Sequence, residues 1–383
     1  MKIDCIRTYH LRHTLTEPFG YSQLTVAARN VLLVEIIADD GAIGWGECYG
    51  PPEVYQATIR SCYGPCLMGR DPLDIDVLWH TMWRTTLDFA RRGVMMGAMS
   101  GLDMALWDLK GKALGCPVSQ LMGGGRVDRL PCYATGMYFR DLADAQLIDA
   151  LIAEAVGYRD QGFVGVKVKI GKTLAFDAEL LVRVREALPD GLLLCDANHA
   201  YDLPEATRIG HLLDELQYGW FEEPLSPEHP EMYRRLQDKL QLPLAAGECE
   251  QTRWGFQSLL APGGVQIAQP DLAYRGGPSE ALKIRGIASS LGINVMPHVW
   301  GTMFNMAAAV HFLASGYREP GRVDAGPLML ECDRSPNALR DELFPTPVRL
   351  ESGLAHVPTG PGLGVTIDQA AMECFLVNED EVR

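Results

Sequence analysis

The stretch VGVKVKIG, residues 164–171, is a β-branched apolar run that carries two lysines, Lys167 and Lys169, and ends in glycine. Such a run predicts a β-strand, and the period of two places both lysine side chains on one face. Burial and a close like charge both lower the pKa of a lysine. We therefore expect an amine that can act as a base near neutral pH. The alternative is an edge strand whose solvated lysines protect it from aggregation.

Around this strand, short apolar segments alternate with longer amphipathic ones from Pro131 onward. Segments 177–187, 204–216 and 278–291 are typical of helices. Eight β/α units over roughly 220 residues fit a (β/α)8-type barrel. The alternative is a doubly wound sheet, but no GxGxxG follows its first strand. The predicted strands are 132–136, 164–170, 192–195, 220–221, 244–246, 265–268, 293–296 and one near Val323.

The segments before and after the predicted barrel have a different sequence pattern. Residues 1–50 predict strands at 5–12 and 31–37 and a hairpin through 44–48, and residues 52–122 are helical in pattern. This first part therefore indicates an α+β unit. The Gly- and Pro-rich tail is expected to return to it. The predicted division is an N-terminal α+β capping domain at 1–128, a barrel at 129–349, and a C-terminal segment at 350–383.

Composition narrows the possible partners. The 383 residues carry a net charge of −15, which argues against nucleic-acid and anionic-membrane partners. No apolar run reaches the roughly 18 residues of a membrane helix, and the first residues lack a signal-peptide pattern. The ten cysteines form no CxxC pair, and the closest two, Cys62 and Cys66, are not a strong zinc signature. We expect reduced core cysteines in a cytoplasmic protein.

Charged residues recur where the predicted strands end. From Asp196 to His298 they are spaced by 23 to 27 residues, about one β/α unit each. Side chains at the carboxyl ends of barrel strands point into one mouth, where barrel enzymes carry out their chemistry. The set consists of Lys167, Lys169, Asp196, Glu222, Glu248, Asp271, His298 and Glu331.

Asp196, Glu222 and Glu248 end three consecutive strands, so their carboxylates should converge. Three carboxylates in one cavity repel one another unless a cation neutralises them, and an all-oxygen site suits Mg²⁺. The alternative is salt bridges to arginines on neighbouring strands. Cys195 and Cys249 adjoin two of the carboxylates, but strand alternation turns them away from the mouth, so we interpret them as packing residues.

Asp271 and His298 end the next two predicted strands. A carboxylate on an adjacent strand can fix the tautomer of an imidazole and raise its basicity. A lone histidine in this context is more often structural. Opposite a lysine pair and beside a metal, we predict a catalytic role for His298.

In order and spacing these residues resemble the enolase superfamily and, within it, the mandelate racemase subgroup. The resemblance extends over nearly the whole chain. The hairpin Gly44-Trp45-Gly46-Glu47 and the segment 297–302 are also similar to galactarolactone cycloisomerases and related acid-sugar enzymes. The motifs that carry the resemblance are Lys167-x-Lys169, Asp196-Ala197-Asn198, Phe221-Glu222-Glu223-Pro224, Gly247-Glu248, Gln269-Pro270-Asp271, Pro297-His298 and Glu331.

The resemblance implies a modified (β/α)7β barrel under a capping domain that the tail completes. It also implies Mg²⁺ on the three carboxylates, and a homo-oligomer between a dimer and an octamer. Lys169 would be one acid/base and the His298–Asp271 pair the other, with the proton-abstracting member left open. Lys167 and a protonated Glu331 would stabilise the enolate that forms when the proton α to a carboxylate is removed.

The expected substrate is a small carboxylate with hydroxyl groups. The first-domain loops offer Tyr21, Ser22, Gln23 and Tyr49 as a lid, and the mouth offers Asn198, His199, Tyr138 and Trp300. Buried polar groups need partners, and an acid sugar supplies them. We therefore predict β-elimination, by dehydration or by ring opening of a lactone or anhydro form, to a 2-keto-3-deoxy acid. The alternatives are a 2-hydroxy acid racemase or epimerase and a non-catalytic binding protein.

Overall fold

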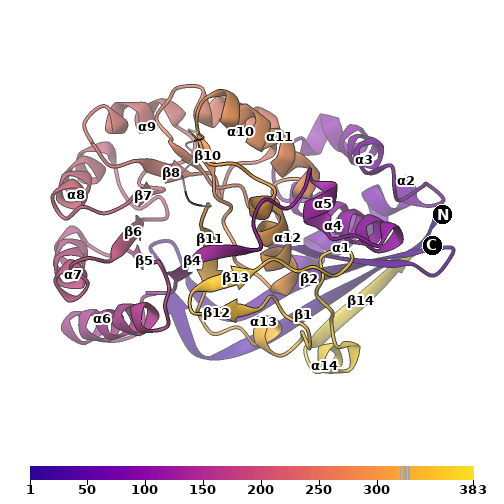
Figure 1. Cartoon of the computed structure of the whole chain (residues 1–383), viewed down its shortest axis with the longest axis horizontal. Coiled ribbons are helices and arrows are strands. Elements are labelled where there is room, and N and C mark those ends of the chain that lie inside the picture. The colour runs from indigo at the N-terminus through magenta and orange to yellow at the C-terminus, as the bar shows by residue number, and fades with distance from the viewer. Residues whose placement is uncertain (320, 322–325, 327) are drawn as a thin grey trace.

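The computed structural model describes residues 1–319, 321, 326 and 328–383. Over these residues the two ends of the chain form an antiparallel sheet, and the middle forms a parallel sheet surrounded by helices (Figure 1). Both termini lie on the side of the antiparallel sheet (Figure 1). The prediction of an α+β unit beside a barrel is confirmed.

The antiparallel sheet has the strand order β14–β1–β2–β3. It comprises β1 (Ile3–Gly20), β2 (Thr25–Ala38), β3 (Ile43–Cys48) and, from the tail, β14 (Leu376–Val382). The tail strand β14 pairs with β1 from Ile6 to Leu11. The end of the tail therefore lies on the N-terminal sheet, while the domain boundaries themselves stay a prediction.

Helix α4 (Met95–Leu114) packs against β3 and needs glycine on the strand. A Cβ atom on Gly46 would lie 2.1 Å from the Gly101 carbonyl oxygen, and real Cβ atoms do not approach so closely. A Cβ atom on Gly44 would likewise lie 2.1 Å from the Ala105 carbonyl oxygen of α4. The remaining elements before the barrel are α1 (Pro52–Thr58), the π-helix η1 (Ile59–Tyr63), α2 (Gly64–Leu67), α3 (Ile75–Ala90) and α5 (Val118–Leu121).

The parallel sheet follows chain order from β4 to β10, and β11 closes back onto β4. Its strands are β4 (Arg129–Thr135), β5 (Gly165–Lys169), β6 (Leu192–Asp196), β7 (Phe221–Glu222), β8 (Leu244–Ala246), β9 (Ile267–Ala268), β10 (Asn294–Val295) and β11 (Leu330–Asp333). The strand predicted near Val323 lies outside the described residues. The strand that pairs with β4 is β11, which carries Glu331.

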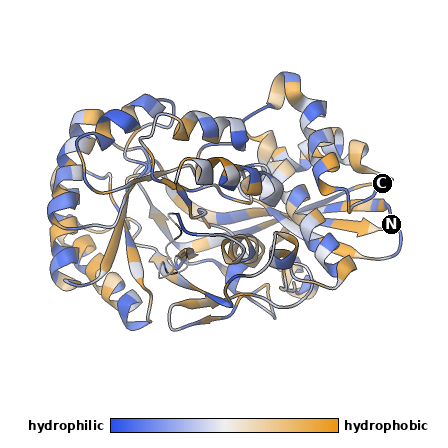
Figure 2. Cartoon of the chain, turned by 45° about the horizontal axis from the view of Figure 1, so that its top comes forward, coloured by the Kyte–Doolittle hydropathy of each residue, from blue (hydrophilic) through white to orange (hydrophobic). Residues whose placement is uncertain are grey.

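A helix follows each strand from β4 to β10, which gives the modified (β/α)7β barrel. Most of these helices bury one face, whereas every residue of α12 is buried. In α8, for example, Ala206, Ile209, Gly210 and Leu213 are buried at helical spacing, and Figure 2 shows hydrophobic and hydrophilic residues mixed along the barrel helices. The helices are α6 (Asp144–Asp160), α7 (Leu174–Ala187), α8 (Leu203–Glu215), α9 (Pro230–Gln237), α10 (Thr252–Leu260), α11 (Gly277–Ser290) and α12 (Met303–Ala314).

The segment after β11 touches both sheets. It contains α13 (Ala338–Asp341), β12 (Leu350–Glu351), β13 (Leu354–His356) and α14 (Gln369–Glu373) before β14. β13 pairs antiparallel with β4 of the barrel. All ten cysteines lie in the described part of the chain and are free there, but only five of them are buried, so the prediction that they are core residues is wrong for the other five. Within the same part, no helix combines the length and the apolar character that a membrane crossing requires.

Candidate active site

The two lysines of β5 are buried at the centre of the barrel mouth. Lys167 Nζ lies 2.6 Å from Glu222 Oε1 and 2.7 Å from Glu331 Oε1. Lys169 Nζ donates to Asp196 Oδ2 at 2.5 Å and to Asn198 Oδ1 at 2.9 Å. Because β5 is paired on both sides, with β4 and β6, the alternative of an edge strand with solvated lysines is wrong.

The charge state expected for the lysines is corrected by these contacts. Burial lowers the pKa of Lys167, but the carboxylates of Glu222, Glu331 and Asp196 outweigh burial and raise it well above its usual value. The pKa of Lys169 is raised in the same way, chiefly by Asp196. The sequence shows the like charge at spacing two, whereas the opposing carboxylates come from other strands. Both lysines are therefore cations within this arrangement.

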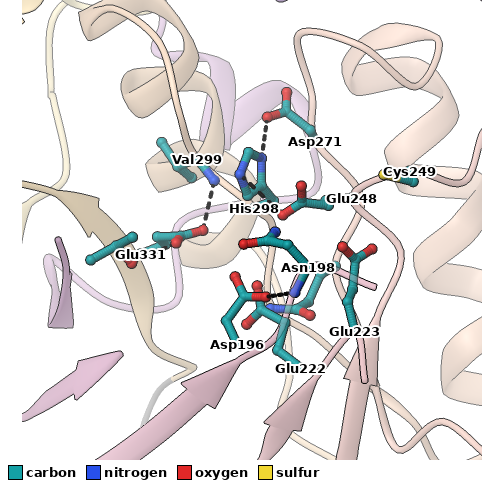
Figure 3. A network of polar contacts seen from close by, with 12 residues as sticks. Asp196, Asn198, Glu222, Glu223, Glu248, Cys249, Asp271, His298, Val299 and Glu331 are labelled. Atoms are coloured by element: carbon teal, nitrogen blue, oxygen red, sulfur yellow. Dashed lines mark hydrogen bonds and ion pairs between the residues drawn. The ribbon is translucent and has the colours of Figure 1, made fainter. Parts of the chain in front are cut away.

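Asp196 ends β6, Glu222 ends β7, and Glu248 follows β8, so three neighbouring strands bring the carboxylates together. One oxygen from each lies within 4.8 Å of the others (Figure 3). Two of the carboxylates are paired with the lysines and not with arginines, which corrects the alternative of arginine salt bridges. Glu248 Oε2 is buried without a hydrogen-bond partner among the described residues. This hard-oxygen set with one unsatisfied atom fits Mg²⁺.

His298 lies in the loop after β10 and is oriented by Asp271. Its Nδ1 lies 2.7 Å from Asp271 Oδ2, and its Nε2 lies 3.4 Å from Glu248 Oε2 (Figure 3). Asp271 is fully buried and also accepts from the Ala273 N–H at 2.7 Å. Burial lowers the pKa of His298, but Glu248 and Asp271 outweigh it and raise the pKa to about 10. The predicted increase in basicity is confirmed.

Glu331 enters the mouth from β11. Its Oε1 accepts from Thr135 Oγ1 at 2.6 Å, and its Oε2 accepts from the Val299 N–H at 3.0 Å. Burial raises the pKa of Glu331, but the cations Lys167 and His298 outweigh burial and lower it to about 2. Glu331 is therefore ionised in this arrangement, where its neighbours donate to it, and its protonation during catalysis stays a prediction.

The first-domain loop at Tyr21 covers the Lys169 side of the mouth. Ser22 Oγ donates to the Ala197 carbonyl at 2.8 Å, and Gln23 Nε2 donates to the Asn198 carbonyl at 2.9 Å. The Tyr21 ring centre is 5.9 Å from Lys169 Nζ. The predicted lid thus rests on the end of β6.

Tyr49 covers the opposite side of the mouth. Its ring lies 6.0 Å from that of His298 and 5.5 Å from that of Trp300, measured between ring centres. The Arg29 guanidinium stacks over the Trp300 ring, 4.0 Å from the ring centre. The two lid tyrosines therefore stand near the two predicted bases.

Sequence reasoning missed the role of Glu47. This buried β3 carboxylate accepts from the backbone N–H and the hydroxyl of Thr302 and from the Asn305 N–H, at 2.5–3.2 Å. It thereby caps α12 just after His298 and Trp300. The hairpin motif around Glu47 was visible in the sequence, but its partners lie more than 250 residues away.

One of the two cysteines next to the carboxylates lies elsewhere than expected. Cys195 is fully buried, as predicted, but Cys249 is exposed and its Sγ lies 3.2 Å from His199 Nε2, so the packing interpretation of Cys249 is wrong. His199 Nδ1 lies 3.2 Å from the Leu225 carbonyl oxygen. Both ring nitrogens of His199 thus have partners within the chain, and its contact with substrate stays a prediction.

Comparison with known proteins shows the family to which this chain belongs. The pattern of the family "Enolase C-terminal domain-like" matches residues 150–371, and that of the "Mandelate racemase / muconate lactonizing enzyme, N-terminal domain" matches residues 5–123. The chain belongs to the enolase superfamily. As an enolase-superfamily protein it is an enzyme of the lyase or isomerase type, so the alternative of a non-catalytic binding protein is set aside.

Its relatives act on acid sugars and their cyclic forms. The chain is 38% identical to a D-galactarolactone cycloisomerase of Agrobacterium fabrum (strain C58 / ATCC 33970), over 98% of this chain and 99% of the relative. The 3,6-anhydro-D-galactonate cycloisomerase structure from Zobellia galactanivorans has a TM-score of 0.89 at 38% identity and covers 99% and 100% of the two chains. L-talarate/galactarate dehydratase from Salmonella typhimurium LT2, liganded with Mg and L-lyxarohydroxamate, has a TM-score of 0.86 at 27% identity, covering 100% and 94%.

Proposed function

We propose that this enzyme removes the proton α to the carboxylate of an acid sugar, or of its lactone or anhydro form, and expels the β-oxygen. Lys169 or His298, once it has released its own proton, takes the proton from the α-carbon, and the other group stays protonated. The electron pair moves into the carboxylate as an enediolate and then returns to break the bond from the β-carbon to oxygen. The leaving oxygen takes a proton from the partner acid, and the resulting enol becomes a 2-keto-3-deoxy acid.

The observation that carries the proposal is the placement of two proton-transfer groups across one mouth. Lys169 ends β5, and the His298–Asp271 pair follows β10 and β9, at the far end of the strand order. A substrate carbon held between them presents one face to each group. Lys167, with its ammonium buried between the carboxylates, supplies fixed positive charge at the base of the mouth.

We propose Asp196, Glu222 and Glu248 as the ligands of Mg²⁺. When bound, the ion supplies positive charge beside the carboxylate oxygens of the substrate. Asn198, held by its contact with Lys169, Trp300 of the mouth and the lid residues Tyr21 and Tyr49 are proposed to bind the remaining substrate hydroxyls. His199 remains proposed for this role through the position of its loop.

Elimination is favoured over racemisation by the polarity of the mouth. The buried Trp300 Nε1 has no hydrogen-bond partner among the described residues, and an unsatisfied buried donor costs about 1–3 kcal/mol. A substrate hydroxyl or ring oxygen would accept from it, whereas an aryl group would not. A β-oxygen is also ready to leave once the enediolate forms. Homo-oligomer formation and a cytoplasmic location stay predictions.

The test is proton NMR of the Mg²⁺-loaded enzyme with a panel of mono- and diacid sugars, their lactones and their anhydro forms. We expect a 2-keto-3-deoxy product, lost in Lys169→Ala and retained in the control Lys172→Ala, whose ion pair with Asp144 lies outside the mouth. Activity confined to mandelate-like or amino-acid-derived substrates would contradict the proposal. Interconversion of 2-epimers without elimination would support the racemase or epimerase alternative instead.

A further inference from the structure

A second cluster of metal-binding side chains stands beside the three carboxylates. His199 Nε2 lies 2.9 Å from Glu223 Oε2 and 3.2 Å from Cys249 Sγ. One ligand atom from each of the three residues lies within 4.8 Å of the others. Glu223 and Cys249 directly follow Glu222 and Glu248, and Figure 3 shows them on the side away from Glu331. The cluster is therefore separate from the proposed Mg²⁺ ligands but shares their strand ends.

One atom of this cluster lacks a hydrogen bond. Glu223 is 1% exposed, and its Oε2 is buried without a hydrogen-bond partner in the part of the chain that the structure describes. His199 Nε2 lies 2.9 Å from this oxygen, a contact that is an ion pair only when the ring is protonated. Beside a neutral ring, the buried carboxylate oxygen is left without a donor, which is costly, and it faces the other two potential ligands. A cation among the three would satisfy it.

The histidine is held in the tautomer that a metal requires. His199 Nδ1 lies 3.2 Å from the Leu225 carbonyl oxygen, to which it can only donate. In the neutral ring this contact leaves the lone pair of Nε2 directed toward the cluster, so a metal ion has to displace the Nε2 proton that the ion pair with Glu223 favours. Metal-binding histidines commonly have their second nitrogen fixed by a backbone carbonyl in this way. The ring orientation is therefore set before an ion binds.

We propose that His199, Glu223 and Cys249 form a second metal site, selective for a borderline ion of the Zn²⁺ or Co²⁺ type. One imidazole, one carboxylate and one thiolate are ligands of tetrahedral zinc, whereas Mg²⁺ takes oxygen ligands. Tetrahedral geometry at zinc–ligand lengths of about 2.0–2.3 Å puts the nitrogen about 3.5 Å from the sulfur and about 3.3 Å from the oxygen. The two distances from His199 Nε2 need to open by only a few tenths of an ångström, and the oxygen and sulfur atoms already lie within 4.8 Å of each other.

The site has an entrance and an open fourth position. Cys249 is exposed and lines a surface cavity of about 410 Å³, together with Glu250, Gln251 and Tyr274. An ion can enter from this side without passing the lid or the substrate. Water can complete the tetrahedron from the cavity. Three protein ligands with one open position are typical of exchangeable zinc.

The test uses Co²⁺ as a probe on protein saturated with Mg²⁺. We expect one Co²⁺ per chain with a thiolate-to-cobalt charge-transfer band in the near ultraviolet, because only the second site contains sulfur. Cys249→Ser should abolish the band, and Glu223→Gln should weaken Co²⁺ binding at least tenfold. The control Cys374→Ser, at another exposed free cysteine, should leave both unchanged.

A second readout is independent of the spectrum. Zn²⁺ should raise the melting temperature of the Mg²⁺-saturated wild type but not that of Cys249→Ser. Absence of the charge-transfer band, or its persistence in Cys249→Ser, would overturn the proposal. In that case the three side chains would form only an ion pair with a hydrogen-bonded thiol.

Discussion

Replacing Asp271 by asparagine should disable His298 without moving it. Both carboxylate oxygens of Asp271 accept hydrogen bonds: Oδ2 lies 2.7 Å from His298 Nδ1, and Oδ1 lies 2.7 Å from the Ala273 nitrogen. An amide has only one oxygen, so its NH₂ must face either the Ala273 N–H or the imidazole. If the NH₂ faces the Ala273 N–H, two buried donors oppose each other. If it faces the imidazole, it donates to His298 Nδ1 and imposes the tautomer in which Nε2 carries the proton.

The size of the effect follows from these contacts. Losing a charge-assisted hydrogen bond and leaving one buried group unsatisfied together cost ~2–4 kcal/mol. Placed on the barrier of the step that uses His298, this loss lowers kcat roughly 30- to 1000-fold. Because Asp271 is one of the groups that raise the pKa of His298, the limb of the pH–rate profile that belongs to this histidine should also move to lower pH.

The assay is kcat against pH for Asp271→Asn with any substrate that the wild type turns over. Asp103→Asn is a matched control, because Asp103 is also fully buried but binds Ser279 outside the mouth. The control should lose stability and keep its pH profile. A kcat of Asp271→Asn within threefold of wild type, with an unmoved profile, would refute the reasoning.

Three further outcomes are expected. Glu248→Gln should abolish Mg²⁺ binding in calorimetry with little loss of stability, since the described residues offer Glu248 Oε2 no hydrogen bond; undiminished affinity would remove it from the ligand set. Tyr49→Ala should change kcat/KM ratios across an acid-sugar panel more than Mg²⁺ affinity, because its ring packs on Trp300 above the mouth; constant ratios would contradict the lid. Burial lowers the pKa of His311 to about 4, while the Ser119 N–H donates to its Nδ1. The unfolded chain binds this proton below about pH 6.5 and the folded chain only near pH 4, so up to ~3 kcal/mol of stability is lost as pH falls across that window. In urea unfolding, the stability advantage of wild type over His311→Gln should therefore shrink between pH 7 and pH 4.5, and a constant advantage would exclude this role.

The strand-end residues could be predicted because they depend on the chain repeat alone. Each β/α unit returns the chain to the same mouth, so spacing along the sequence brings Asp196, Glu222 and Glu248 within 4.8 Å. The pairing of His298 with Asp271 followed from adjacent strands in the same way. Strand ends in a barrel are fixed by topology, and topology is visible in the alternation of segments.

Other features could not be predicted because they depend on contacts between distant segments or on local backbone turns. The charge states of Lys167 and Glu331 depend on partners from other strands. Glu223 has a left-handed backbone, with φ 42°, so strand alternation does not describe where its side chain goes. The same failure of alternation beyond β8 concealed the contact between Cys249 and His199.

The most direct test of the proposed proton transfer is deuterium incorporation at the α-carbon in D₂O. Wild type, Lys169→Ala and His298→Asn are compared by NMR with one active acid sugar, its 2-epimer and saturating Mg²⁺. The account predicts that both substitutions abolish turnover, while each variant still exchanges the α-proton that the remaining base reaches, with opposite preference between the epimers. Turnover and exchange that neither substitution lowers would contradict it.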